Sequence, residues 1–176
     1  MRRFLIASAA AVLASSAALA DLNVGDAAPD FTVTGYQAGE ARTFTLSEAL
    51  ENGPVVAFFF PAAFTSGCEA QAASFAESIA EFEALGAQVI GLTAGNVDRL
   101  PDFSTQHCAD AFPVFGVDND MIQAYDARLR PGGNWTGRIT YVIGQDSTIA
   151  YHYADMSPYE HVDNSLTALR EMGGAE

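Results

Sequence analysis

One short segment of the sequence combines a proline, a threonine and a cysteine at chemically suggestive spacing. Pro61-x-x-x-Thr65-x-x-Cys68 follows the apolar run 54–60 and precedes a segment with helical spacing. A cysteine in the first turn of a helix meets unpaired N–H groups and the positive end of the helix dipole, and both favour the nucleophilic thiolate. The threonine hydroxyl can donate to the sulfur or bind a substrate oxygen, and Pro61 can direct the chain and shield the sulfur. The segment therefore predicts a reactive thiol at Cys68.

The elements around this segment predict alternating strands and helices. The run 54–60 is continuously apolar, as expected of a central strand covered on both faces, and residues 87–93 predict a second buried strand. Between them, apolar residues recur at helical spacing and predict one helix that ends at Gly86. These residues are Phe75, Ile79, Phe82 and Leu85.

The remaining patterns predict an α/β fold. Strands are expected over 30–34, 42–46, 112–115, 139–143 and 148–153, and helices over 47–50, 97–110, 119–128 and near the C-terminus. This order favours a thioredoxin-like sandwich, with a central mixed sheet and helices on both faces. Residues 61–68 then lie at the carboxyl end of a central strand, where ligands and chemistry gather in such sheets.

The first twenty residues predict a cleaved secretory signal peptide. Met1-Arg2-Arg3 is basic, residues 4–19 are almost wholly Ala, Leu, Ile, Val and Ser, and Ala18-Leu19-Ala20 is a small-x-small cleavage site. The alternative is a membrane anchor, but the run is short for a span of ~20 residues and its side chains are small. We therefore expect an exported protein, in the bacterial periplasm, with residues 21–176 forming a single domain.

The charge balance limits the partners of the chain. The sequence has no lysine, and loss of Arg2 and Arg3 leaves six arginines against 22 acidic residues. Such a surface repels nucleic acid and anionic membranes, so we expect neither as a partner.

The two cysteines, Cys68 and Cys108, lie 40 positions apart. This spacing excludes a CxxC dithiol and a cysteine-rich zinc site, and leaves one disulfide, a redox pair, or a reactive thiol with a bystander. His107, His152 and His161 form no pair with metal-ligand spacing, so no metal or cofactor is expected. His107 either assists Cys108 or is simply a solvated helix residue.

The stretch 58–68 resembles the active-site segment of the peroxiredoxins (the AhpC/TSA and redoxin group), with every fixed motif position matched. Residues 137–143 resemble the strand that carries the catalytic arginine of that family, which maps to Arg138. The resemblance spans Val24 to Leu169. It implies a thiol-dependent peroxidase for hydrogen peroxide or organic hydroperoxides.

In that chemistry the Cys68 thiolate attacks the peroxide and becomes a sulfenic acid. Arg138 would stabilise the thiolate and the charge that develops on oxygen, and Thr65 with the backbone amides 66–68 would hold the peroxide. The other interpretations are a buried core cysteine, a surface ion pair for Arg138, and a helix-capping role for Thr65.

The chain also departs from the family pattern. Ala73 occupies the position where Q-type members often carry a second cysteine, and Gln71 replaces a glutamate, for which Glu69 could compensate. The segment 100–108 is similar to the helix that holds the resolving cysteine of atypical two-cysteine thiol peroxidases. Cys108 is thus the tentative resolving residue; a structural thiol and a partner for another molecule are the alternatives.

The resemblance further implies an external thiol reductant, either a thioredoxin-like protein or a small thiol, and a monomer or homodimer. A periplasmic thioredoxin-like thiol-disulfide oxidoreductase is a weaker interpretation, because Cys68 has no vicinal cysteine. A non-catalytic peroxide sensor remains a further alternative. Trp135 is expected either to line the substrate mouth or to pack in the core.

Overall fold

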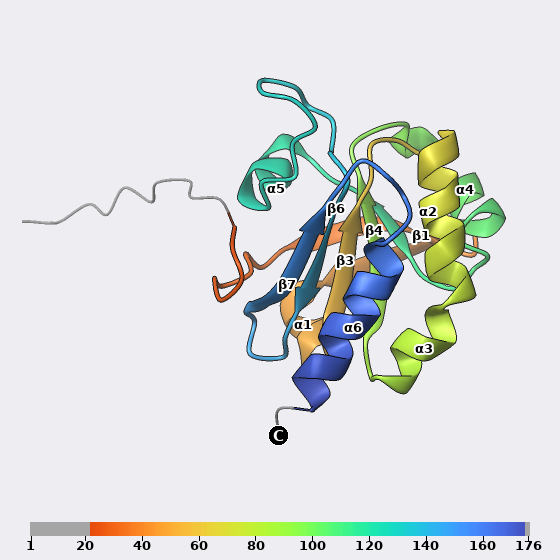
Figure 1. Cartoon of the computed structure of the whole chain (residues 1–176). Coiled ribbons are helices and arrows are strands. Elements are labelled where there is room, and N and C mark those ends of the chain that lie inside the picture. Colours follow the sequence, from red (N-terminus) through yellow and green to blue (C-terminus); the bar gives the residue numbers. More distant parts are fainter. Residues whose placement is uncertain (1–21, 175–176) are drawn as a thin grey trace, which may run out of the picture.

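A seven-stranded mixed sheet forms the centre of the computed structural model, which describes residues 22–174 (Figure 1). The predicted signal peptide, residues 1–20, lies outside the described residues. The strand order is β2-β1-β5-β4-β3-β6-β7. The strands are β1 Thr32–Gln37, β2 Glu40–Thr45, β3 Val55–Phe59, β4 Gln88–Thr93, β5 Val114–Gly116, β6 Ile139–Ile143 and β7 Ile149–Ala154.

The strand β3 is central and its side chains reach both faces of the sheet. It pairs in parallel with β4 and antiparallel with β6, and β4 is also parallel to β5. Val56 and Phe58 enter one apolar core, whereas Ala57 and Phe59 enter the other. The continuous apolar run therefore reflects burial on both faces, as predicted.

Helices cover the two faces of the sheet (Figure 1). The helices α2 Ser66–Glu77, α3 Ile79–Ala84, α4 Leu100–Gln106 and α6 His161–Gly173 contribute to one core. The helices α1 Leu46–Leu50 and α5 Asn119–Ala124 contribute to the other core. The predicted thioredoxin-like sandwich is confirmed. No helix in the range 22–174 has the length and apolarity to cross a membrane.

The single helix predicted to end at Gly86 is in fact two helices. They meet at Ser78, whose ψ of 4° departs from helical geometry and whose N–H is shared between the Ser74 and Phe75 carbonyls. The Ser74 hydroxyl donates to the Ala70 carbonyl one turn earlier, a contact that bends helices. The bend preserves the apolar face, since the buried Phe75 and Phe82 rings still pack together. The apolar spacing predicts the buried face of both helices but not the break between them.

Two other helices end earlier than the sequence predicts. The segment predicted as a helix over 97–110 contains a short 3-10 helix, η1 Val97–Arg99, followed by α4 to Gln106. Ala109 and Asp110 both have positive φ angles, which a continuing helix does not allow. The helix predicted over 119–128 ends at Ala124.

Candidate active site

The Cys68 thiol lies in the first turn of α2, directly after the loop that leaves β3. Its N–H donates to the Thr65 carbonyl at 2.9 Å, and the residue is 1% exposed. The loop enters the helix through Phe64, which adopts a left-handed conformation with φ of 59°. Cys68 is therefore buried, but it occupies the position at the start of a helix that the sequence predicts for a reactive thiol.

The Pro61 end of the loop is held against the segment that follows β4. The Pro61 carbonyl accepts a hydrogen bond from the Thr93 hydroxyl at 3.2 Å, and the Ala63 N–H donates to the Gly95 carbonyl at 3.1 Å. A Cβ atom at Gly95 would lie 2.3 Å from the Pro61 carbonyl oxygen. Only glycine fits there, so this contact fixes the start of the loop.

Strand pairing brings Arg138 to Cys68. Phe59, the last residue of β3, pairs with Ile139, the first residue of β6, so Arg138 lies beside the loop that carries the cysteine. The guanidinium Nη2 donates to the Cys68 Sγ at 3.6 Å. A Cβ atom at Gly67 would approach Nη2 to 3.0 Å, so the small residue leaves room for the guanidinium.

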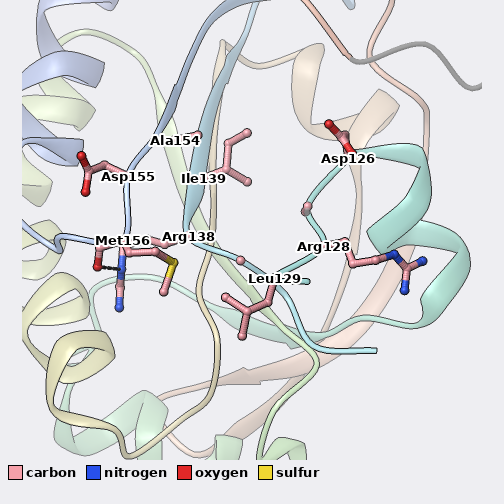
Figure 2. A pocket seen from close by; sticks show the side chains of 10 residues that line it. Asp126, Arg128, Leu129, Arg138, Ile139, Ala154, Asp155 and Met156 are labelled. Carbon is pink, nitrogen blue, oxygen red and sulfur yellow. Dashed lines mark hydrogen bonds between the residues drawn. The ribbon is translucent and has the colours of Figure 1, made fainter. Parts of the chain in front are cut away.

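The Arg138 guanidinium has two further partners that orient it. Nη1 donates to the Gln71 Oε1. Nε donates to the Met156 main-chain carbonyl at 3.0 Å, the contact drawn in Figure 2. Arg138 is 6% exposed and takes part in none of the ion pairs of the described residues. The surface ion pair weighed for Arg138 is therefore wrong, and the full charge of a buried guanidinium faces the sulfur.

The Thr65 side chain differs from its predicted interactions. Thr65 occupies the N-cap position of α2, but its side chain does not cap the helix. Its hydroxyl donates to the Ala62 carbonyl at 3.0 Å, not to the Cys68 sulfur. Because the proton is engaged by Ala62, the hydroxyl oxygen is left as an acceptor for a substrate O–H group.

The glutamine that replaces the family glutamate is buried beside Arg138. Gln71 is 0% exposed, and its Nε2 has no hydrogen-bond partner. Glu69 does not compensate for the missing carboxylate, because it faces away toward His107, with Oε1 3.5 Å from Nε2. A neutral amide thus orients Arg138 without neutralising it.

The second cysteine is a fully buried free thiol in the same apolar core as Cys68. Cys108 follows the end of α4, and its N–H bonds to the Phe103 carbonyl at 3.3 Å. Burial, and next the charge of Asp110, raise the pKa of the Cys108 thiol above its usual value. In this arrangement Cys108 is protonated and a weak nucleophile.

A cluster that the sequence analysis did not identify joins Cys108 to the active-site loop. The His107 ring packs edge-on against Phe64 and at a tilt against Phe103, with a centroid distance of 5.2 Å in each pair. The Arg99 guanidinium lies over the Phe64 ring, 3.6 Å from its centroid. His107 is therefore not a solvated helix histidine. The positive φ of Phe64, which turns its ring toward α4, has no signal in the sequence.

The other two histidines lie apart from each other. His152 stacks on Tyr141, and His161 is buried at the start of α6. Within residues 22–174, no three His, Cys, Asp or Glu side chains gather in a way that could hold a metal ion.

Two cavities flank the loops near Arg138. One, of about 270 Å³, is lined by ten residues that include Arg138, Leu129 and Met156 but neither Cys68 nor Thr65 (Figure 2). The other is lined in part by Trp135, which is 45% exposed and so does not pack in the core. Cys68 lines neither of these two cavities; the candidate reaction site is the buried contact between Cys68 and Arg138.

A buried thiol at a helix start, faced by a buried arginine in a thioredoxin-like fold, defines a thiol enzyme of the peroxidase type. The model of the AhpC/TSA family matches residues 24–152. The chain is 28% identical over 149 residues to peroxiredoxin Q of Oryza sativa subsp. japonica, covering 84% of this chain and 67% of that protein. It is 29% identical over 152 residues to peroxiredoxin Q of Arabidopsis thaliana, covering 86% and 68%. Both relatives are described as chloroplastic.

Solved structures agree with these relatives. Peroxidoxin BcpB from Mycobacterium tuberculosis matches with a TM-score of 0.75 and 28% identity, covering 86% of this chain and 98% of that one. The reduced 2-Cys peroxiredoxin of Plasmodium vivax, at 12% identity, shares the fold with a TM-score of 0.76. The chain belongs to the AhpC/TSA family, and it is a peroxiredoxin-type thiol peroxidase, as the sequence predicted. The thiol-disulfide oxidoreductase alternative is not favoured.

Proposed function

We propose that Cys68 is the peroxide-attacking residue of this enzyme and that Arg138 activates it. The observation that carries the proposal is the 3.6 Å contact between the Arg138 Nη2 and the Cys68 Sγ, at the first turn of α2. A buried positive charge and the N-terminal amides of the helix both favour the thiolate.

The reaction begins with attack of the Cys68 thiolate on the terminal oxygen of H2O2 or an organic hydroperoxide. An S–O bond forms and the O–O bond breaks, which oxidises the sulfur to a sulfenic acid and reduces the leaving oxygen to hydroxide or alkoxide. That oxygen takes a proton from solvent and departs as water or alcohol. Arg138 stabilises the negative charge as it moves from sulfur to oxygen.

Thr65 and Pro61 position the peroxide and protect the sulfur. The Thr65 hydroxyl gives its proton to Ala62, so its oxygen is available to accept a hydrogen bond from the peroxide O–H. Pro61 lies two residues beyond the end of β3, and its ring limits the access of water to the loop. The N–H groups of residues 66–68 supply further donors to the bound oxygens.

Cys108 is proposed to resolve the sulfenic acid. Its thiol condenses with the Cys68 sulfenic acid to give a disulfide and one water molecule. Because Cys108 is buried and its pKa is raised, the segment after α4 must open before this step. An external thiol reductant, a thioredoxin-like protein or a small thiol, then reduces the disulfide and completes the cycle.

The first twenty residues are proposed to export the enzyme to the bacterial periplasm, leaving residues 21–176 as one domain that acts as a monomer or homodimer. Export would separate it from the cytosolic thiol reductants. Mass spectrometry of the mature chain tests cleavage: an N-terminus at Asp21 is expected, and a retained Met1 in the extracytoplasmic fraction would contradict it.

Peroxide consumption with a thiol reductant tests the chemical roles. Cys68→Ser is expected to abolish turnover, whereas Cys108→Ser retains the first oxidation and stops there. After one equivalent of H2O2, the mass should fall by two hydrogens in the unaltered protein and rise by one oxygen in Cys108→Ser. Turnover by Cys68→Ser would overturn the assignment of Cys68. A gain of one oxygen in the unaltered protein would instead remove Cys108 from the cycle.

A further inference from the structure

A buried histidine, His161, links β6, the strand that follows Arg138, to the loop whose carbonyl orients Arg138. The His161 Nδ1 lies 2.9 Å from the Thr140 hydroxyl, and its Nε2 lies 3.0 Å from the Asp155 main-chain carbonyl. His161 is the first residue of α6 and is 0% exposed. Both contacts are made by the imidazole side chain and not by main-chain hydrogen bonds of a helix or strand. The ring itself therefore connects Thr140 on β6 to the Asp155 loop.

The partners of the ring determine its tautomer. A main-chain carbonyl can only accept, so the His161 Nε2 carries the hydrogen and donates it to Asp155. The Nδ1 is then the acceptor of the Thr140 hydroxyl proton. The neutral imidazole satisfies both contacts at once.

These contacts close a ring of interactions around Arg138. Arg138 and Thr140 are two residues apart and point to the same face of the sheet. The Thr140 hydroxyl reaches His161, His161 holds Asp155, and the next carbonyl, that of Met156, accepts from the Arg138 Nε at 3.0 Å. The Met156 residue is 54% exposed, so its own packing contributes little to holding this carbonyl in place.

We propose that His161 is a positioning residue of the active site: it anchors the loop whose Met156 carbonyl holds the Arg138 guanidinium against Cys68. The proposal rests on the proposed roles of Cys68 and Arg138. The adjacent Asp155 carboxylate reinforces the same turn, because its Oδ1 accepts from the Ser157 N–H at 2.7 Å.

The surroundings of the ring favour its neutral form. Burial, and the charge of Arg138 just before β6, lower the pKa of His161, while main-chain hydrogen bonds with Asp155 and Ser157 and the Asp155 carboxylate oppose that shift. From β7, Tyr153 packs edge-on against the ring at 4.9 Å and donates to the Glu160 carboxylate. Protonation of His161 would place a second positive charge near Arg138, so acid is expected to weaken the anchor.

The test compares His161→Ala, His161→Gln and the control Leu166→Ala in the Cys108→Ser background. Leu166 is a buried residue of the same helix that makes packing contacts only in the apolar core. Two readouts are needed: the single-turnover rate with H2O2, and the pH midpoint of Cys68 alkylation by iodoacetamide. His161→Ala is expected to slow the peroxide reaction ~10-fold and to move the alkylation midpoint to higher pH, since one charged hydrogen bond is loosened.

His161→Gln can still donate to the Asp155 carbonyl, so it should retain most of the single-turnover rate. Because glutamine does not titrate, the part of the rate decline in acid that comes from protonation of His161 should be absent in this variant. Leu166→Ala should lower the melting temperature and leave both readouts unchanged. A His161→Ala variant that loses only thermal stability would overturn the proposal. Alkylation reports on the Cys68 thiolate without any peroxide, so it tests the role of His161 independently of the peroxidase reaction. Turnover of peroxide by Cys68→Ser would contradict the proposed peroxidase role of Cys68, which is a separate result.

Discussion

The charge balance around the sulfur depends on one neutral side chain, Gln71. Its Oε1 accepts from the Arg138 Nη1, and no carboxylate shares this guanidinium among the ion pairs of residues 22–174. A glutamate would orient the arginine equally well, but it would place a negative charge beside the thiolate. The glutamine therefore leaves the positive charge of Arg138 available to Cys68 and to the oxygen that leaves.

Gln71→Glu is accordingly expected to slow the reaction of Cys68 with H2O2 by ~10-fold at neutral pH, because a like charge disfavours the thiolate. Stopped-flow oxidation measures the rate, and iodoacetamide alkylation reports the thiolate directly. Gln71→Met is the matched control, since it removes the acceptor without adding charge. An unchanged rate in Gln71→Glu would mean that the neutral residue has no electrostatic role.

The geometry of Arg138 should matter as much as its charge. Its Nε, Nη1 and Nη2 reach Met156, Gln71 and Cys68. A lysine keeps the charge but cannot hold these three directions at once. Arg138→Lys is therefore expected to lower kcat/KM for peroxide ~100-fold. Arg170→Lys is the control, because Arg170 pairs with Glu81 on the surface; equal rates in the two variants would contradict a geometric role.

At the scale of elements, the strands could be predicted from the sequence more fully than the helices. A continuous apolar run identifies β3 and a largely apolar segment identifies β4, because their side chains are buried on both faces. The break at Ser78 could not be predicted, since the apolar spacing continues through it and the distortion arises from a local hydroxyl contact. The motif identifies Cys68, and Arg138 is found by resemblance. Their proximity follows only from the register of β3 and β6.

We expect the contact between α4 and the active-site loop to control the access of solvent to the Cys108 thiol. His107 packs on Phe64 and lies within ion-pairing distance of Glu69, and Cys108 follows it in the chain. Opening the segment around Cys108 must separate these groups. The packing of His107 on Phe64 should therefore keep the Cys108 thiol buried until this segment opens locally.

His107→Ala is expected to raise the alkylation rate of Cys108 in the folded, reduced protein by ~10-fold, because a weaker contact lowers the cost of local opening. Peptide mapping after timed alkylation measures each thiol separately. His152→Ala is the control: it removes a histidine that stacks on Tyr141 and belongs to another part of the sheet. Equal Cys108 rates in the two variants would argue against a gating role for His107.

For the molecule as a whole, strand direction gathers the site at one end of the sheet. The end of β3 leads to Cys68, the start of β6 follows Arg138, and the end of β7 leads to Met156 (Figure 1). Ile139 pairs with Phe59 on one side and with Ala154 on the other. Because β6 runs antiparallel to both β3 and β7, Arg138 and the Met156 carbonyl lie at the same end of the sheet as Cys68, which follows β3.

The buried neutral His161 links this arrangement to the stability of the whole molecule. Its pKa is lowered from 6.5, mainly by burial, so the unfolded chain binds a proton more readily than the folded one. Stability therefore falls as the pH drops below about 6.5, by at most ~1.4 kcal/mol per pH unit from this group, until the folded pKa is reached. Asp30 acts in a different window. Hydrogen bonds from Ser47 lower its pKa from 3.8, so its contribution is present above that value and lost as the pH falls through the lower folded value.

Urea unfolding at about pH 7.5 and about pH 5 separates these groups, because Asp30 remains ionised at both values. The unaltered protein should be less stable at the lower pH. His161→Gln should show a smaller loss, since glutamine does not titrate, whereas the control Ser47→Ala should keep the full dependence in this range. If His161→Gln and the unaltered protein lose the same unfolding free energy between the two pH values, His161 does not take up a proton on unfolding. The physical basis for the expected weakening of the His161 contacts in acid would then be absent.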